Sequence, residues 1–353
     1  MRTILVHALS GNDNRMFDPD ERDGCNDPAI YLRERLHQLG YDLRTADDNS
    51  LKGCEWVFFY DARSVRRSGW RGLARTVKDR LQGRRALRDL YGECMRAGME
   101  RRMALFLWEA PAVSPENWNP ELHELFPIVF TWHDRYMNDG RFRKIHWPQT
   151  RQFPAVRKVP FRERKLLVNI SMNKSASHPR ELYSARRASI RYCERAQPDG
   201  FDLFGVGWNR PGGLLQRMWP FPRRIYPSYR GTVKNKWEVL PHYRFSLCYE
   251  NIRDEPGWVT EKIFDCMRSR CVPIYWGAPN IADYVDAAAF IDRRRFKSDA
   301  EMVEYLLCMT EQKYEHFQEA MQDYLQSERF ARFLPPAYAD TIIQALKLTA
   351  QAC

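Results

Sequence analysis

Apolar and polar positions follow a distinct order around residue 260. An apolar block at Tyr243–Tyr249 precedes a polar loop rich in turn formers, residues 250–257. Apolar side chains then recur at helical spacing over 263–267, and a second short apolar block follows at 271–276. The pattern predicts a strand, a loop, a helix and a strand, which form a βαβ unit with parallel strands and a right-handed crossover.

The same alternation of short apolar blocks and helical periodicity extends along the chain. In the first half we expect strands at 3–9, 41–45, 55–60, 103–108 and 128–132, and helices at 30–39 and 87–97. In the second half we expect strands at 166–172 and 201–206, and helices at 179–194, 233–240, 300–325 and after Pro336. This order predicts doubly wound parallel sheets. A proline-containing, non-periodic stretch near 150–163 predicts a division into domains at 1–155 and 156–330, with a C-terminal helix at 331–353.

Composition is consistent with two globular domains of ordinary size. The chain has 353 residues, of which 44% are hydrophobic and 13% aromatic. No apolar run approaches the ~20 residues that a membrane helix needs. Nine cysteines without paired spacing indicate free thiols in a reducing compartment. We therefore expect a soluble cytoplasmic protein.

The net charge of +11 calls for an anionic partner. An anionic nucleotide, an acidic membrane surface and nucleic acid would each fit. The densest basic run lies between residues 63 and 102, where Arg67, Arg71, Arg75 and Lys78 share a helical face. No nucleic-acid module accompanies them, so we expect no nucleic-acid partner and favour a solvated face or peripheral contact with the inner face of the membrane. A basic nucleic-acid-binding protein stays the alternative.

The βαβ unit predicts where a ligand binds. Ligands of open parallel sheets bind beyond the carboxyl ends of the strands, which here are the loops 250–259 and 277–280. The helix that opens at Thr260 directs unpaired amides there. Lys262 in its first turn is disfavoured by the helix dipole unless an anion lies nearby; a solvated lysine beside Glu261 is the alternative. We expect the helix to expose the polar face formed by Glu261, Lys262, Asp265 and Arg268.

Several elements of this region resemble a known family. Glu250-Asn251, then Trp258-Val259-Thr260-Glu261-Lys262-Ile263, then Val272-Pro273-Ile274-Tyr275-Trp276-Gly277, and finally Phe290-Ile291-Asp292 with Phe296, occur in fixed order. Together they are similar to the α1,3/α1,4-fucosyltransferases, glycosyltransferase family 10, in its soluble bacterial type. The resemblance implies a GT-B-like fold, in which two Rossmann-like α/β domains face each other across a cleft. It also implies an inverting transfer of L-fucose from GDP-fucose to a hydroxyl of GlcNAc or Glc, in an α1,3-type linkage. The acceptor would be an oligosaccharide, a glycolipid or a lipopolysaccharide, and a transferase of another nucleotide sugar is the alternative.

The resemblance assigns roles in donor binding. Lys262 and Arg180 would contact the diphosphate, and Glu261 would accept hydrogen bonds from sugar or ribose hydroxyls. Glu250, Asn251 and Thr260 complete the expected donor site. Trp258 stands where the family commonly has tyrosine.

Glu109 is the expected general base, because it follows a strand of the first domain and matches a family glutamate. Glu116 and His133 are the runners-up. No metal is expected to be required, and a divalent ion would at most stimulate. The D-x-D spacing of Asp18 and Asp20 lies in an early loop, away from the donor unit.

Overall fold

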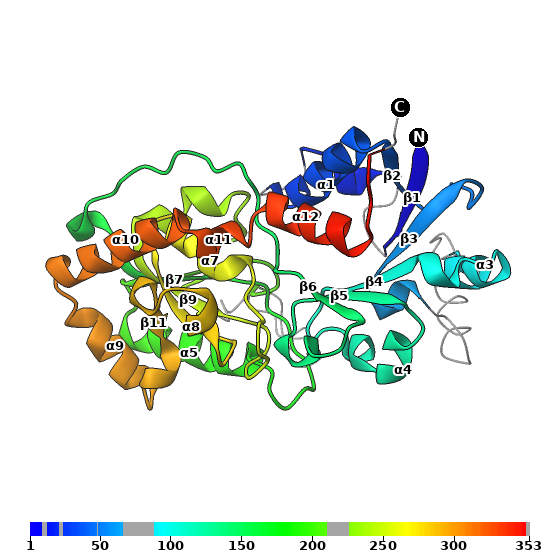
Figure 1. Cartoon of the computed structure of the whole chain (residues 1–353). Coiled ribbons are helices and arrows are strands. Elements are labelled where there is room, and N and C mark those ends of the chain that lie inside the picture. The colour runs from blue at the N-terminus through cyan, green and yellow to red at the C-terminus, as the bar shows by residue number, and fades with distance from the viewer. Residues whose placement is uncertain (9–12, 21–23, 48, 66–87, 210–225, 351–353) are drawn as a thin grey trace. The chain divides into compact units, whose positions relative to one another are not determined.

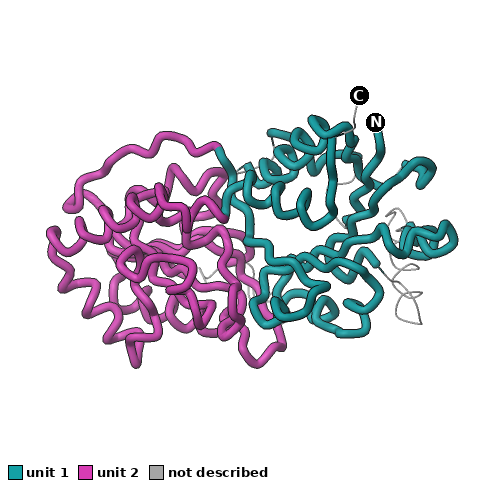
Figure 2. The backbone as a smooth tube through the Cα atoms, in the orientation of Figure 1, with its two compact units in different colours: residues 1–151, 333–353 teal, residues 152–332 magenta. Residues whose placement is uncertain are grey.

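The computed structural model describes residues 1–8, 13–20, 24–47, 49–65, 88–209 and 226–350. The chain divides into two compact units (Figure 2). The first comprises residues 1–151 and 333–353, and the second residues 152–332. The C-terminal residues therefore belong to the first unit. Most of the basic run predicted as a surface face, including Arg67, Arg71, Arg75 and Lys78, lies outside the described residues.

The first unit contains a six-stranded parallel sheet with the order β2-β1-β3-β4-β5-β6. Its strands are β1 (Arg2–His7), β2 (Tyr41–Thr45), β3 (Cys54–Tyr60), β4 (Met103–Leu107), β5 (Ile128–Thr131) and β6 (Phe142–Lys144). Helices α1 (Asp27–Gln38) and α12 (Pro335–Ala345) cover one face, and α3 (Leu90–Arg96) and α4 (Pro120–His123) lie on the other (Figure 1). All five residues of β4 are buried, as expected for a central parallel strand that is covered on both faces.

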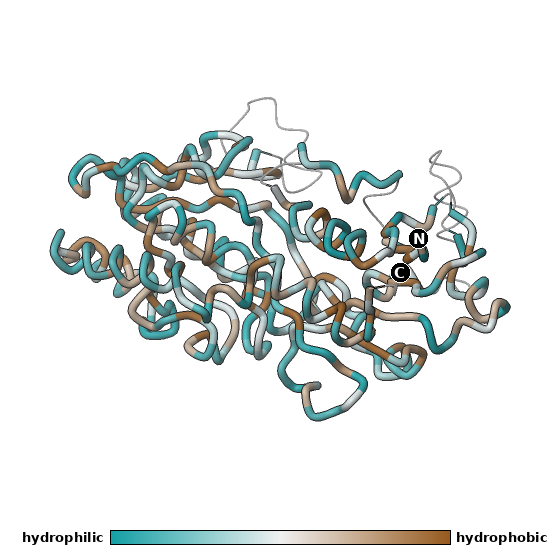
Figure 3. Tube along the Cα trace, turned by 45° about the horizontal axis from the view of Figure 1, so that its top comes forward, coloured by the Kyte–Doolittle hydropathy of each residue, from teal (hydrophilic) through white to brown (hydrophobic). Residues whose placement is uncertain are grey.

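The second unit contains a five-stranded parallel sheet with the order β11-β10-β9-β7-β8. Its strands are β7 (Lys165–Ile170), β8 (Phe201–Phe204), β9 (Tyr243–Tyr249), β10 (Val272–Trp276) and β11 (Ile291–Asp292). Its helices are α5 (Tyr183–Ala196), α7 (Glu261–Arg268), α8 (Ile281–Tyr284), α9 (Asp299–Leu307), α10 (Glu311–Leu325) and α11 (Glu328–Ala331). Hydrophobic stretches alternate with hydrophilic ones along the trace (Figure 3). The predicted βαβ unit is confirmed as β9–α7–β10, with β9 and β10 parallel.

Three helix predictions differ from the structure. The helix expected at 233–240 is replaced by two 3-10 turns, at Lys236–Glu238 and Leu240–His242. The long helix expected at 300–325 is interrupted after Leu307, and Thr310 then caps α10 through a hydrogen bond to its side chain. The helix expected from residue 179 begins at Tyr183. Such breaks are hard to predict, because apolar residues can keep their helical spacing in the sequence on both sides of a helix end.

The two sheets share one topology. Numbered along its own unit, each sheet begins with the order 2-1-3-4-5, so the chain direction across the sheet reverses between the first and third strands. These switch points lie between β1 and β3 in the first unit and between β7 and β9 in the second. The carboxyl side of a switch point is where open α/β sheets bind ligands.

No helix among the described residues has the length and apolar character needed to cross a bilayer. The described cysteines are free thiols. Cys54, Cys94, Cys193, Cys248, Cys266 and Cys271 are buried, whereas Cys25 and Cys308 are exposed.

Candidate functional site

Glu250 organises the carboxyl end of β9. It follows the last residue of the strand, and its side chain is fully buried. Its carboxylate accepts hydrogen bonds from the Thr260 amide at 3.0 Å and the Thr260 hydroxyl at 2.9 Å. It also forms an ion pair with Lys262 Nζ at 2.8 Å. The Glu250 carboxylate therefore accepts hydrogen bonds at the start of α7. It also pairs with Lys262, the residue that the sequence analysis expects to contact the diphosphate.

Lys262 keeps its charge in this network. Burial lowers its pKa, but the negative charges of Glu250 and Glu261 outweigh that effect and raise the pKa above its usual value. Glu261 shows the opposite balance: burial raises its pKa, but the charges of Lys262 and Lys236 hold it below the usual value. Both groups are therefore ionised at neutral pH. The Lys262 side chain remains 27% exposed.

The expected solvent-exposed face of α7 is wrong at two of its four positions. Asp265 and Arg268 are buried. Asp265 forms an ion pair with Lys236 at 2.7 Å, and Arg268 stacks on the ring of Phe153. The helix is covered by segments far away in the sequence, which the local pattern of polar residues does not reveal.

Three cations line a small cavity at the switch point between β7 and β9. The cavity has a volume of about 40 Å³, and its lining includes Arg186, Lys236 and Lys262. Arg186 is buried, and its guanidinium donates to the carbonyl oxygens of Tyr249 and Glu250. Burial lowers the pKa of Arg186. The lining also includes Asp265, so three cations and one carboxylate lie where the topology predicts a ligand.

Arg180 lies beside the same loop. It precedes α5 in a turn that pairs with the loop through the bridge between Glu181 and Ile252. Its guanidinium donates to the Asp254 carbonyl at 3.0 Å and forms an ion pair with the buried Glu255. The structure therefore brings Arg180 and the loop after β9 together, as the sequence predicted.

The other expected donor residues have structural contacts of their own. Trp258 is 1% exposed, and its carbonyl accepts a hydrogen bond from the Tyr275 hydroxyl. The carbonyl of Asn251 accepts a hydrogen bond from the Leu182 amide. Gly277 is a position that sequence reasoning missed. A Cβ added there would lie 2.5 Å from the Tyr275 hydroxyl oxygen and 2.6 Å from Cγ of Glu250, so any larger residue would displace one of these side chains.

Glu109 occupies a rigid position at the end of β4. Asp61 accepts hydrogen bonds from the amides of Trp108 and Glu109 at 2.8 and 3.2 Å. The Glu109 carbonyl accepts further bonds from Asn117 Nδ2 and from Trp118 Nε1. The backbone that carries the expected base is thus held from both its amide and its carbonyl.

Asp61 is strained and was not predicted. Its backbone has φ 63° and ψ 158°, a region that non-glycine residues rarely adopt and that costs of the order of 1–3 kcal/mol. Burial raises its pKa, opposed by the hydrogen bonds that it accepts from Trp108 and Glu109. Such strain persists where the surroundings impose it, here through the contacts around Glu109. No local sequence signal reveals a positive φ at an aspartate.

The two runners-up for the base have contacts of their own. Glu116 forms an ion pair with Arg63 at 2.5 Å. His133 is buried and stacks on Trp132, and its Nδ1 accepts a hydrogen bond from the Arg135 amide. Among the described residues, no group of three or more His, Cys, Asp or Glu side chains could hold a metal ion. Asp18 and Asp20, the pair with D-x-D spacing, are not part of such a group.

Solved structures define the class of the fold. A crystal structure of an α1,3-fucosyltransferase is similar over 98% of this chain and 90% of its own, with a TM-score of 0.54 at 17% identity. The same kind of enzyme with GDP-fucose gives a TM-score of 0.51. The DNA-modifying enzyme β-glucosyltransferase matches over 99% and 100% of the two chains, with a TM-score of 0.54 at 11% identity. The chain therefore has the α/β, GT-B-like fold of glycosyltransferases.

Sequence comparison adds the family. Residues 224–332 match the model of glycosyltransferase family 10 (fucosyltransferase), C-terminal part. An α-(1,3)-fucosyltransferase of Helicobacter pylori is 43% identical over 75 residues, and an α-(1,4)-fucosyltransferase of Arabidopsis thaliana is 34% identical over 108 residues. These matches cover 21% and 29% of this chain, but only 16% and 26% of the relatives. Residues 224–332, at the C-terminal end of the second unit, are thus similar to the C-terminal part of glycosyltransferase family 10, and the chain spans only a small part of the relatives that it matches.

Proposed function

We propose that the protein transfers L-fucose from GDP-fucose to a hydroxyl of a glycan acceptor, with inversion at the anomeric carbon. The observation that carries the proposal is the network of Glu250, Thr260 and Lys262 at a switch point of the sheet, within the segment that matches the family. An α1,3-type linkage to GlcNAc or Glc is the form that the family resemblance favours.

The donor site is proposed at the carboxyl ends of β7 and β9. Lys262 and Arg180 would bind the diphosphate together with the first amides of α7. The side chains of Lys262 and Arg180 are 27% and 35% exposed, and each forms an ion pair. As the bond from the anomeric carbon to the phosphate oxygen breaks, negative charge grows on GDP, and these cations stabilise it.

The acceptor step is assigned to Glu109. Its carboxylate would take the proton of the attacking hydroxyl while the hydroxyl oxygen forms a bond to the anomeric carbon. The electron pair of the breaking bond leaves with GDP from the opposite side. A β-linked donor therefore gives an α-linked fucoside. The contacts that Asp61 and Asn117 make around Glu109 would keep its position constant during the reaction.

We further propose that the cations supply the electrostatic stabilisation and that a divalent metal at most stimulates. Transfer measured after dialysis against EDTA should then retain most of its rate. A loss of more than tenfold that Mn²⁺ or Mg²⁺ restores would contradict this part of the proposal.

The main alternative is a transferase of a different nucleotide sugar, because the β-glucosyltransferase of similar fold was crystallised with uridine diphosphoglucose. Calorimetric titration with GDP, UDP and CDP separates the two. A clear preference for GDP is expected, with GDP-mannose titrated beside GDP-fucose. A preference for UDP would refute fucosyl transfer. Peripheral membrane contact and the absence of a nucleic-acid partner both stay predictions, because most of the arginines concerned lie outside the described residues.

A further inference from the structure

Arg186 of α5 is a buried cation without an ion-pair partner. The residue is 3% exposed, and its Nη2 donates to the carbonyl oxygens of Tyr249 at 2.5 Å and Glu250 at 3.0 Å. Among the described residues Arg186 forms no ion pair, and its Nε is buried without a hydrogen-bond partner. Burying a charge is costly unless another charge compensates it, so we expect Arg186 to balance an anion at this end of the sheet.

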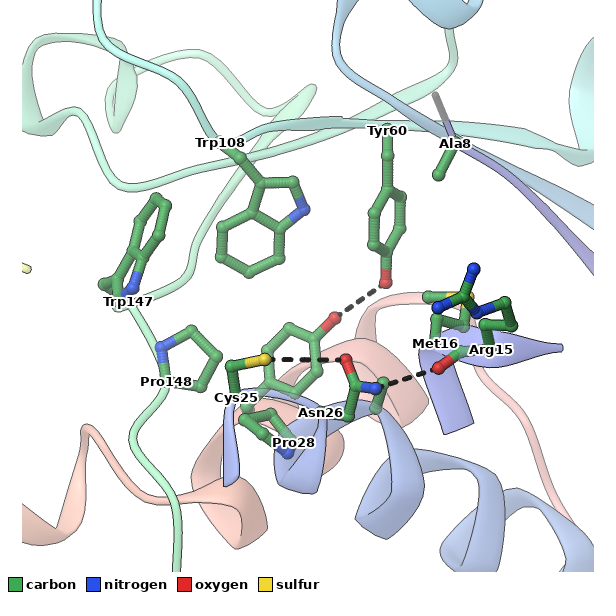
Figure 4. Close-up of a pocket in the computed structure, with 12 residues that line it drawn as sticks. Ala8, Arg15, Met16, Cys25, Asn26, Pro28, Tyr60, Trp108, Trp147 and Pro148 are labelled. Atoms are coloured by element: carbon green, nitrogen blue, oxygen red, sulfur yellow. Dashed lines mark hydrogen bonds between the residues drawn. The ribbon is translucent and has the colours of Figure 1, made fainter. Parts of the chain in front are cut away.

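The space beside Arg186 is too small for a diphosphate. Arg186 lines the cavity at the switch point between β7 and β9, whose volume of about 40 Å³ holds about one water molecule. By comparison, the cavity of the first unit that Trp108, Trp147 and Tyr60 line has a volume of about 620 Å³ (Figure 4). Arg186 therefore does not contact the donor itself and can act on the donor site only through its neighbours.

Glu250 is the neighbour that needs a positive charge. Its carboxylate is fully buried, and its ion-pair partner Lys262 also pairs with Glu261 at 3.6 Å. Two carboxylates thus depend on one lysine, while Arg186 contacts the backbone carbonyl of Glu250. Burial lowers the pKa of Arg186, and the charge of Glu250 is among the effects that oppose this shift.

The other charged and titratable groups around this network do not supply the missing charge. Lys236 is paired with Asp265 at 2.7 Å. Burial raises the pKa of Cys248 and of Tyr275 well above their usual values, so both groups are neutral at neutral pH. Among the described residues, Arg186 is thus the cation of this network that has no carboxylate partner.

We propose that Arg186 is a positioning residue that balances the charge of Glu250 when Lys262 turns from this carboxylate to the diphosphate of the donor. Without Arg186, that movement would leave a fully buried carboxylate with no cation, which opposes donor binding. With Arg186, the network keeps one positive charge near Glu250, and Lys262 can stabilise the leaving group. The inference rests on the proposed function at one point, the contact of Lys262 with a diphosphate.

Unfolding in urea tests the charge balance without any donor. Lys262→Met imitates the departure of the lysine, and a double variant adds Arg186→Met. With Arg186 present, Glu250 stays ionised, so the midpoint of Lys262→Met should change little between about pH 5.5 and pH 8. In the double variant the carboxylate binds a proton and its pKa rises above the unfolded value of about 4.3, so the midpoint should fall as the pH rises through this range. A double variant with the same pH profile as Lys262→Met would overturn the proposal.

Titration with GDP tests the same balance in the donor site. Arg186→Met should weaken GDP binding at least about tenfold, and Arg186→Lys, which keeps the charge, should restore most of the affinity. Calorimetry in buffers of different ionisation enthalpy should show that Arg186→Met takes up more protons on GDP binding than the parent does. In a Glu250→Gln background, Arg186→Met should weaken binding less than about threefold, because no carboxylate is left to balance. An equal loss in both backgrounds would show that Arg186 only supports the loop, and the proposal would fail.

Arg164 provides the matched control. It is 5% exposed and donates to the backbone carbonyls of Val159 and Arg270, but it precedes β7, at the opposite end of the sheet. Arg164→Met should lower stability and leave GDP affinity and proton uptake as in the parent. The same changes in Arg164→Met as in Arg186→Met would refute the assignment.

Two outcomes separate this inference from the proposed function. GDP binding that Arg186→Met leaves unchanged would refute the role of Arg186 and leave fucosyl transfer intact. Absence of GDP binding by the parent would refute the donor site of the proposed function, and the unfolding profiles would still decide whether Arg186 balances Glu250.

Discussion

The ion pair between Glu250 and Lys262 gives the sharpest energetic prediction. Replacing Glu250 with glutamine keeps the shape of the side chain but removes the charge that Lys262 contacts at 2.8 Å. Breaking a buried pair by removing one partner costs about 3–5 kcal/mol. Lys262 is 27% exposed and regains part of its hydration, and the amide oxygen can still accept one bond from Thr260. We therefore expect Glu250→Gln to lower the free energy of unfolding by about 2 kcal/mol.

Lys262→Met should cost more, about 3 kcal/mol, because it leaves a fully buried carboxylate without its counter-charge. The double variant should lose less free energy of unfolding than the sum of the two single variants. The coupling energy should be at least about 1.5 kcal/mol, as expected for residues in contact. Urea unfolding followed by tryptophan fluorescence measures all three. With a slope of about 2 kcal/mol per molar urea, Glu250→Gln shifts the midpoint by about 1 M.

Asp254→Asn is the matched control for these variants. The ion pair between Arg253 and Asp254 has a similar length of 2.9 Å, but each side chain is 43% exposed. Its loss should change the free energy of unfolding by less than about 1 kcal/mol. A coupling energy between Glu250 and Lys262 no larger than that of this exposed pair would refute the reasoning.

The pH dependence follows from the raised pKa of Lys262. Stability from a raised pKa is fully present below the pKa of the unfolded lysine, about 10.4, and is lost as the pH rises through the folded value. The deficit of Glu250→Gln should therefore stay constant between about pH 6 and pH 9. A deficit that disappears within this range would show that the pair is not the cause.

Three further predictions concern other sites. Glu109→Gln should keep GDP affinity in calorimetry and lose transfer by at least about a hundredfold, since the amide cannot take a proton; full activity would move the base elsewhere. Gly277→Ala should weaken GDP binding and lower the unfolding midpoint, because the new Cβ would displace Glu250; unchanged values would show that the carboxylate needs no such space. Burial, and secondarily the charge of Arg88, lowers the pKa of His7 to about 4. The lowered pKa therefore contributes about 3 kcal/mol to the free energy of unfolding above about pH 6.5, and this contribution is lost as the pH falls toward 4. The pH profile of His7→Gln in urea unfolding should lack this component, and a profile with the same acid loss would contradict it.

Most strands and the fold class could be predicted from the sequence. The β9–α7–β10 unit was predicted to within a residue or two, because buried parallel strands form short continuous apolar blocks. Breaks within apolar periodicity could not be predicted. Buried residues recur at helical spacing both in α9 (Met302, Leu306) and in α10 (Tyr314, Met321), so the apolar pattern does not reveal the break before Thr310.

The candidate site was predicted only in part. Lys262 and Arg180 were expected near the loop after β9 from strand ends and motif order, and both have partners in or next to that loop; their role at the diphosphate stays a prediction. Their partners Glu250 and Glu255 could not be paired with them from spacing, because those contacts depend on how a loop folds back. Asp61 and Asn117 lie 48 and 8 residues from Glu109 in sequence, and neither belongs to a motif. Contacts of that kind become visible only when the sheet brings the strand ends together.

The return of residues 333–353 to the first unit has a consequence for the order of folding. The core of that unit includes Tyr338 and Ile342 of α12, which pack with Ile4 and Phe58. During synthesis, these side chains leave the ribosome after the whole second unit, whose residues are contiguous. The second unit can therefore complete its core first. The six-stranded sheet of the first unit, although synthesised earlier, is covered on one face only after α12 has been made.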